Sequence, residues 1–330
     1  MGQLIKNGFH INDPRINYSK FARFCLNVYN WGDKTFNSYD PEYVVPSGRN
    51  WKVTAKSFNW GESCLLMFPG NTSLRMFSHL YSDLGPTVSF MAVSISYTFN
   101  ANELFKNPTS TRKNIDYSFT CARFAADLNV TSTNGGMRIT KFGRYNLNGH
   151  SFDFNDVTMK SSRINAYYFF NHSKYSQAAA YCFSKYQLKS AGSLIVGVNF
   201  MKQKIDLNFS QLPEDMVKYL PGDHERYNFY YTDYNVMCGY GYNWVLAPRR
   251  WLFNITAIPS IGYKHSYEGS TDGRKDMFAT NLKAMFSFVY NHRSLFASLT
   301  GRLDGNVYYG DKYTFLNSIE SISFIVGARF

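Results

Sequence analysis

Long runs of strict two-residue alternation constrain the fold of this sequence more than any other feature. Between residues 295 and 307, one set of alternate positions is apolar or small, whereas the other set carries Arg302 and Asp304. Successive side chains of a β-strand point to opposite faces, so this pattern predicts a strand with one apolar and one polar face. The same alternation occurs over residues 114–121, 193–200, 231–244 and 321–330.

The length of these runs favours a membrane barrel over a soluble β-sandwich. Sandwich strands average about five to six residues, whereas several runs here exceed about ten, the length that a tilted strand needs to cross a bilayer. Aromatic and charged residues each make up 18% of the chain, as expected when one face meets lipid and the other meets water. We predict an all-β fold, a transmembrane antiparallel up-and-down β-barrel of about 12 to 14 strands, with short periplasmic turns and longer extracellular loops.

The lengths of the connections between strands predict which ones are short turns and which are long loops. Short turns are expected near residues 59–62, 247–249 and 291–293, and long polar loops at residues 32–50, 101–113, 133–159, 206–225 and 264–275. Residues 171–190 fit poorly as a lipid-facing strand, and the small residues that follow Gln187 permit close backbone approach, so we expect a bend or an insertion into the lumen. We assign residues 1–18 to an N-terminal periplasmic segment and residues 19–330 to the barrel domain.

The N-terminal residues bear on location. Residues 1–18 contain no apolar signal-peptide core and no small-residue cleavage site. For a protein of the bacterial outer membrane, we therefore expect the mature chain, with its signal peptide removed.

Charge and cysteine content narrow the expected partners. The formal net charge is +12, but lysine and arginine are scattered with no long basic run. Basic residues near lipid phosphates and lipopolysaccharide explain this excess better than nucleic acid does. The five cysteines show no CxxC spacing, and the histidines show no metal-ligand spacing, so we expect no disulfide framework, metal or cofactor.

Charged and amide side chains on the inward faces are the candidate functional residues. They form either a polar path that selects solutes or a network that packs and plugs a narrow barrel, and both hypotheses remain open. The candidates are Asp116, Asp233, Asn243, Lys283, Arg302, Asp304 and Arg329. The closing Phe330 resembles the terminal signal that the barrel-assembly machinery recognises, so that machinery is an expected partner during biogenesis.

Catalysis has little support in the sequence. No GxSxG motif is present, and the sequence does not indicate whether Ser176, His172 and a carboxylate converge. We expect no enzyme, but either a narrow solute channel or an accessory component of an envelope complex, in which other envelope proteins are partners. The alternatives are an outer-membrane hydrolase acting on lipid or peptide through a rim residue such as His172 or His265, and a secreted all-β carbohydrate-binding protein.

Several motifs resemble a known family. They are Tyr-Tyr-Phe-Phe-Asn at 167–171, Tyr-Ser-Gln-Ala-Ala at 175–179, Gln-Leu-Lys-Ser-Ala-Gly-Ser at 187–193, Tyr-Asn-Trp-Gly-Asp-Lys at 29–34, Gly-Tyr-Gly-Tyr-Asn-Trp at 239–244 and the closing Gly-Ala-Arg-Phe. Together they resemble the Bacteroidota family catalogued as domain of unknown function 4421. The resemblance implies an outer-membrane barrel of a Gram-negative bacterium, and it implies neither a reaction nor functional residues.

Overall fold

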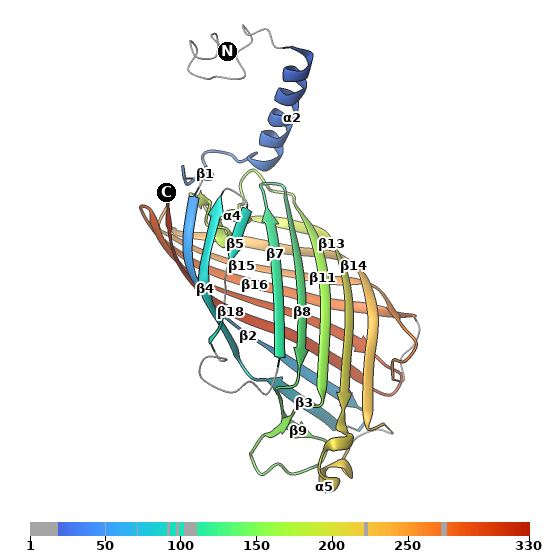
Figure 1. Cartoon of the computed structure of the whole chain (residues 1–330). Helices are drawn as coiled ribbons and strands as arrows, with labels where there is room; N and C mark the ends of the chain where they lie inside the picture. Colours follow the sequence, from blue (N-terminus) through green and yellow to red (C-terminus); the bar gives the residue numbers. More distant parts are fainter. Residues whose placement is uncertain are drawn as a thin grey trace.

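One antiparallel sheet of sixteen strands makes up most of the structure and curls into a barrel (Figure 1). The computed structural model describes residues 19–49, 51–70, 72–90, 93–96, 99–101, 111–220, 224–271 and 276–330. Its strands are β2 (Trp51–Phe68), β3 (Thr72–Ser78), β4 (Tyr81–Phe90), β5 (Val93–Ser96), β6 (Phe99–Asn100), β7 (Thr111–Thr120), β8 (Phe124–Asn134), β9 (Met137–Phe142), β10 (Phe152–Phe154), β11 (Val157–Phe169), β13 (Ala191–Asn208), β14 (Arg226–Ala247), β15 (Trp251–Ser266), β16 (Asp276–His292), β17 (Leu295–Tyr309) and β18 (Thr314–Arg329).

Strand order confirms the predicted up-and-down barrel. The hydrogen-bonded path is β10-β9-β3-β2-β18-β17-β16-β15-β14-β13-β11-β8-β7, and β4 lies beside β2, β5 and β6. Strands that are neighbours in the chain pair with each other from β13 to β18, and β18 then pairs with β2. From β8 round to β2, long strands joined in this order form a wall whose backbone groups are paired between strands, as in a membrane barrel. Among the described residues, the path ends at β7 on one side and β10 on the other.

The two ends of the barrel carry different connections. Turns 247–251 and 292–295 lie at the same end as the chain's C-terminus, which we call the termini end. The longer connections 134–157, 208–226 and 266–276 lie at the opposite end, which we call the loop end. The loop end also carries β9, β10, the short helix α5 (Glu214–Val217) and the 3-10 turn η1 (Phe209–Gln211).

Side chains of the wall are apolar on its outer face and polar on its inner face, the reverse of a soluble protein. Apolar side chains point outward and are exposed, with exposed fractions of 58% for Val198, 59% for Val236 and 58% for Ile261. Polar side chains point inward and are buried, among them Asn165 and Asp233. An apolar outer band around a polar interior is the arrangement of a transmembrane barrel.

The predicted turn at residues 59–62 is wrong. These residues lie within the continuous strand β2, which pairs with β4 up to Trp60 and with β3 from Ser63 onward. The break lies instead in the neighbouring strand, between Ser78 and Tyr81, and the Ser78 hydroxyl accepts a hydrogen bond from the backbone N–H of Glu62 at 2.8 Å. Turn-forming residues in β2 therefore mark a break in its partner.

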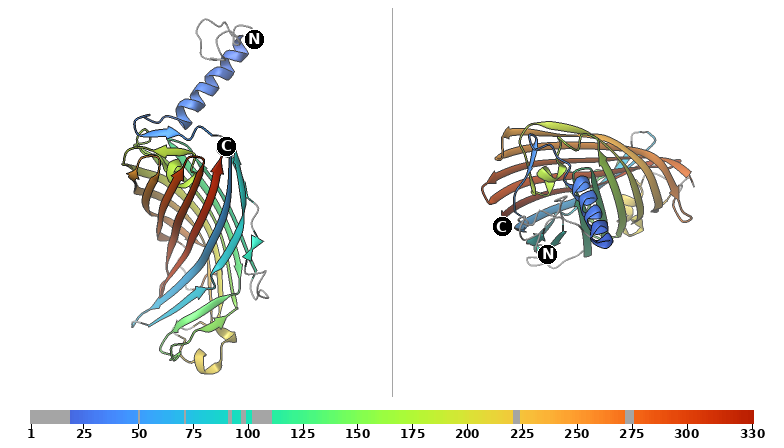
Figure 2. Two further views of the ribbon diagram at one scale, coloured as in Figure 1. Left: turned by 90° about the vertical axis from the view of Figure 1, so that its left-hand side faces the viewer. Right: turned by 90° about the horizontal axis from the view of Figure 1, so that it is seen from above.

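A helix precedes the barrel. Helix α2 (Lys20–Phe36) projects away from the termini end (Figure 2). Its last residue contacts the wall, because Phe36 packs edge-on against Phe119 of β7 with ring centroids 5.7 Å apart. Among the described residues, no helix is both long enough and apolar enough to span a bilayer.

Candidate functional site: the barrel interior

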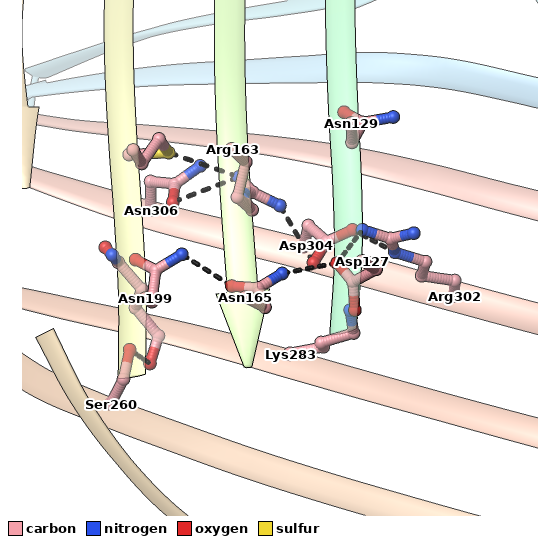
Figure 3. Close-up of polar contacts among 12 residues, drawn as sticks. Asp127, Asn129, Arg163, Asn165, Asn199, Ser260, Lys283, Arg302, Asp304 and Asn306 are labelled. Carbon is pink, nitrogen blue, oxygen red and sulfur yellow. Dashed lines mark hydrogen bonds and ion pairs between the residues drawn. The ribbon is translucent and has the colours of Figure 1, made fainter. Parts of the chain in front are cut away.

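A belt of buried and partly buried charges lies inside the barrel (Figure 3). We define this charge belt as Asp127, Arg163, Lys283, Arg302 and Asp304. The Lys283 ammonium lies 2.8 Å from Asp127, and the Arg163 guanidinium lies 2.8 Å from Asp304. The Arg302 guanidinium donates from Nε to Asp304 and also lies 3.8 Å from Asp127, so it joins the two pairs into one network.

The charge belt joins opposite walls of the barrel. Four strands separate β8, which carries Asp127, from β16, which carries Lys283. Four strands likewise separate β11 from β17, which carry Arg163 and Asp304. Direct contact between side chains so far apart in the sheet means that the opposite walls are connected through these groups.

Neutral amides extend the belt around the wall. The Asn165 amide donates to Asp127 at 2.5 Å, Asn199 donates to Asn165 at 2.6 Å, and Asn235 donates to Asn199 at 2.9 Å. The Tyr167 hydroxyl also donates to Asp127 at 2.8 Å. Buried carboxylates are stable in such an interior only when charged partners and donors surround them.

A second buried ion pair lies nearer the loop end. The Lys264 ammonium is 2.5 Å from Asp233, and both side chains are fully buried. Asn281 donates to the other Asp233 oxygen at 3.1 Å, and the Tyr231 ring lies 3.5 Å from the ammonium. This pair is satisfied within the protein, so it does not present a free charge to a solute.

Beyond the ion pairs, apolar side chains close the loop end. Phe229 stacks on Phe315 with ring centroids 4.1 Å apart, and Tyr308 and Tyr313 pack edge-on against Phe229. We call this group the loop-end cluster, which comprises Cys64, Leu66, Leu74, Met76, Met137, Ile139, Phe142, Phe154, Val157, Met159, Met201, Ile205, Leu207, Phe209, Leu212, Met216, Tyr227, Phe229, Tyr231, Met277, Tyr308, Tyr313 and Phe315.

At the termini end, residues 171–190 enter the barrel mouth and form what we call the plug. Its helix α4 (Gln177–Tyr181) is buried except at its last residue, and Ser176 caps it by accepting from the Ala179 backbone N–H at 3.1 Å. Its strand β12 (Lys185–Gln187) pairs with β1 (Val44–Pro46) outside the main sheet. The predicted bend or insertion of residues 171–190 is therefore confirmed.

Polar wall residues hold the plug. Asn243 donates to the Ser176 carbonyl and to the Gln187 side chain, both at 3.0 Å. The Tyr181 hydroxyl donates to Asn254 at 2.7 Å, and the Ser287 hydroxyl donates to the Ala180 carbonyl at 2.5 Å.

Arg329 is the charged anchor of the plug. Its guanidinium donates to the Phe183 carbonyl at 2.7 Å and to the Tyr186 hydroxyl at 3.1 Å, both in the plug. It also donates to Asn291 of the wall at 2.6 Å. The side chain is buried and lies 4.3 Å from the centroid of the Phe296 ring. One side chain of the last strand thus ties the plug to the wall.

A cavity of about 260 Å³ remains between the charge belt and the plug. Its lining includes Trp60, Asp116 and Arg302 from the wall and Gln177 and Tyr181 from the plug. It therefore has charged groups at one side and the plug at the other.

The structure brings only some of the predicted lumen residues together. Lys283, Arg302 and Asp304 meet in the charge belt, and Asp116 lies beside it, 3.8 Å from Arg302. Asp233 pairs separately with Lys264, whereas Asn243 and Arg329 contact the plug. Phe330 has an exposed side chain and pairs through its backbone with Trp51, and its recognition by the assembly machinery stays a prediction.

The sequence analysis did not identify three charged residues of the lumen: Asp127, Arg163 and Lys264. Asp127 and Arg163 occupy inward positions of alternating strands, so extending the alternation to residues 124–134 and 157–169 could have found them. Lys264 was placed in a predicted loop, whereas β15 continues to Ser266. All three residues were missed because β8, β11 and β15 are longer than the strands predicted there.

The candidate catalytic groups do not converge. The Ser176 hydroxyl caps α4, whereas His172 faces the Ser38 hydroxyl at 3.1 Å. Partial burial and the nearby Arg123 guanidinium lower the pKa of His172. At the loop end, His265 lies 3.0 Å from Asp276 across β15 and β16. Within the described part of the chain, no group of three or more His, Cys, Asp or Glu side chains could hold a metal ion.

Comparison with solved structures returns outer-membrane proteins at very low identity. The outer membrane protease OmpT from Escherichia coli is 8% identical with a TM-score of 0.35, over 85% of this chain and 97% of that chain. The Pseudomonas putida toluene transporter TodX is 7% identical with a TM-score of 0.27, over 85% and 90%. Similarities this weak give no information about the activity of this chain.

Sequence comparison gives a family. No curated protein matches the sequence. The family model for the domain of unknown function DUF4421 matches residues 38–330, which include every strand of the barrel. The chain belongs to the DUF4421 family.

Proposed function

We propose that this chain is a plugged barrel of a Gram-negative outer membrane, with a structural or accessory role in an envelope complex rather than a role as a solute channel. The charge belt carries this proposal, because its ion pairs connect opposite walls of the barrel. Rings of charge that select solutes leave a water-filled path between them. Here the charged groups bind one another instead.

The two ends of the lumen support the same proposal. The loop-end cluster fills one end with apolar side chains, and the plug fills the other. A solute would have to displace both layers and break the charge belt. The apolar outer band supports a membrane location, since the exposed Val198, Val236 and Ile261 would otherwise face water.

Single-channel recording tests the proposal. The refolded chain, checked by heat-modifiable gel mobility, is inserted into planar bilayers beside a known porin as a positive control. We expect no stable conductance steps from this chain. Reproducible steps from the wild-type protein would overturn the proposal.

A variant that lacks the plug sharpens the test. Replacing residues 174–187 by a short Gly-Ser linker removes α4 and leaves the charge belt and the loop-end cluster in place. We expect this variant to remain silent in the same bilayers. If it conducts while the wild type does not, the plug is a gate and the chain is a channel.

We also propose that the barrel is not an enzyme. The exposed His265–Asp276 pair is the arrangement closest to a catalytic dyad, but the group that joins it is the Tyr263 hydroxyl, which donates to Asp276. We expect no hydrolysis of acyl esters or peptides by the folded protein. A hydrolysis rate that disappears in His265→Ala but persists in His292→Ala would assign an enzyme.

A further inference from the structure

Four lysines gather on the outer wall near the loop end. They lie on strands β7, β11 and β13. Lys113 of β7 and Lys160 of β11 both pair with Ser132 of the intervening strand β8, and Lys160 pairs with Lys204 of β13. Lys202 lies two positions from Lys204 on the same outward face of β13. We call this group the lysine patch: Lys113, Lys160, Lys202 and Lys204, all exposed.

The lysine patch lacks compensating carboxylates. The nearby Asp206 is bound by Arg226, and Asp276 faces His265. No ion pair among the described residues includes any of the four lysines. Like charges directly opposite each other across two strands, such as Lys160 and Lys204, destabilise a sheet. An anion bound between them would remove that cost.

The surroundings of the lysine patch match the boundary between lipid headgroups and acyl chains. The next outward row toward the barrel centre is apolar or aromatic and exposed, with Ile164, Phe200 and Tyr234 in register across β11, β13 and β14. On the other side, the Lys202 ammonium lies 5.4 Å from the centroid of the Tyr230 ring. Lys160 lies three residues from the start of β11, about 10 Å from the loop end.

We propose that the lysine patch binds the phosphate groups of an outer-leaflet lipid, whose acyl chains lie along Ile164, Phe200 and Tyr234. This inference rests on the proposed outer-membrane location and on the predicted orientation, in which the longer loops, and therefore the loop end, are extracellular. Two adjacent lysine pairs on a flat wall fit a headgroup that carries two phosphates, such as a phosphorylated glycolipid. The bound anion bridges Lys160 and Lys204, and the neighbouring aromatic rings contact the upper parts of the chains.

Lipid titration monitored by native mass spectrometry tests the inference. The full chain in a neutral detergent is titrated with bisphosphorylated lipid A and, separately, with dephosphorylated lipid A. The test variant is Lys160→Gln/Lys202→Gln/Lys204→Gln, which keeps most of each side chain and removes three charges. We expect wild-type protein to prefer the phosphorylated lipid and the variant to bind it roughly 100-fold more weakly.

The control is Arg249→Asn/Arg250→Gln, which removes two exposed charges from the turn at the termini end. We expect it to bind lipid A as the wild type does. Thermal melting in lipid-free detergent shows whether each variant folds, and removal of the like-charge pair should not lower the melting temperature of the test variant.

Three results would overturn the inference: equal binding of both lipids by the wild type, unchanged binding by the test variant, or equal loss in the control. A test variant that does not fold is replaced by Lys160→Gln alone, whose binding is then expected to fall by about fivefold. Failure of the proposed function would appear differently, as conductance steps in planar bilayers.

Discussion

At the loop end, the lumen is closed by apolar side chains that come mostly from the strands, with Phe209, Leu212 and Met216 added by the 208–226 connection, whereas at the termini end it is closed by an inserted segment. The first closure depends on packing among rings such as Phe229 and Phe315. The second depends on hydrogen bonds from wall residues such as Asn243 and Arg329 to the backbone of the plug. The closure at the loop end thus rests mainly on apolar packing of strand residues, while the plug is a separate segment held by polar contacts.

This difference predicts that a ring in the loop-end cluster contributes more to global stability than any single plug contact. Phe229→Ala removes a fully buried ring, and we expect it to lower the free energy of unfolding by about 3–5 kcal/mol. Guanidinium unfolding in lipid vesicles measures the change. Phe200→Ala on the outer wall is the control and should cost less, because 38% of that side chain is exposed. Equal losses would contradict the comparison.

Arg329→Ala breaks the charged anchor of the plug. It removes three hydrogen bonds from a buried guanidinium, and we expect a loss of about 2–3 kcal/mol in the free energy of unfolding. The same change should expose residues 171–190 to limited proteolysis from the termini end. Arg329→Lys keeps the positive charge but not the planar guanidinium, so its free energy of unfolding should lie between those of the wild type and Arg329→Ala. If Arg329→Ala lowers the free energy of unfolding but residues 171–190 stay resistant to proteolysis, Arg329 stabilises the wall and not the plug.

Ser176→Ala removes the cap of α4 and a long hydrogen bond, 3.4 Å, from the Ser176 hydroxyl to the Tyr39 hydroxyl. An N-cap hydroxyl is worth about 1 kcal/mol, so we expect a loss of that size, with faster hydrogen exchange in residues 177–181. Ser162→Ala, on the exposed outer face, is the matched control. Faster exchange throughout the wall would show that the plug and the wall do not unfold separately.

His172 gives the smallest expected effect. Its pKa in the folded protein is lowered, so between the ordinary value near 6.5 and the lowered value, the unfolded chain binds more protons. Stability therefore falls as the pH drops through this window and recovers above it. We expect the melting temperature of the wild type, relative to His172→Gln, to decrease by roughly 1 °C at most between pH 7.5 and pH 5.5. A relative increase would mean that the imidazolium is stabilised.

The wall could be predicted from sequence more fully than the interior. Alternation over residues 295–307 is a local property, and it placed Arg302 and Asp304 on the inward face of β17. The partners of these charges come from β8 and β11, on the opposite wall, and no local pattern indicates which residues meet there. The sequence pattern therefore predicted which face a side chain occupies, but it could not predict which side chains meet across the lumen.

Two local errors have a related cause. The turn expected at residues 59–62 was inferred from turn-forming residues whose effect falls on the neighbouring strand. Helix α2 was missed because the region was examined only for period-two alternation, although Phe21, Phe24 and Trp31 recur at helical spacing. At residues 59–62 the composition indicated a break but not the strand that carries it, and at residues 20–36 the spacing of the apolar residues indicated a helix and not a strand.

The pairing of β18 with β2 has a consequence for biosynthesis. The Ser63 and Ser318 hydroxyls, 2.6 Å apart in this pairing, are 255 positions apart in the chain. The seam between these strands can form only after the ribosome has made the final strand, and contacts of such large sequence separation form slowly. Until then, the apolar outward faces of the earlier strands have no lipid to cover them. The nascent protein must therefore be kept from aggregating until this seam has formed, so its yield in a cell is expected to depend on help during folding more than on its final stability.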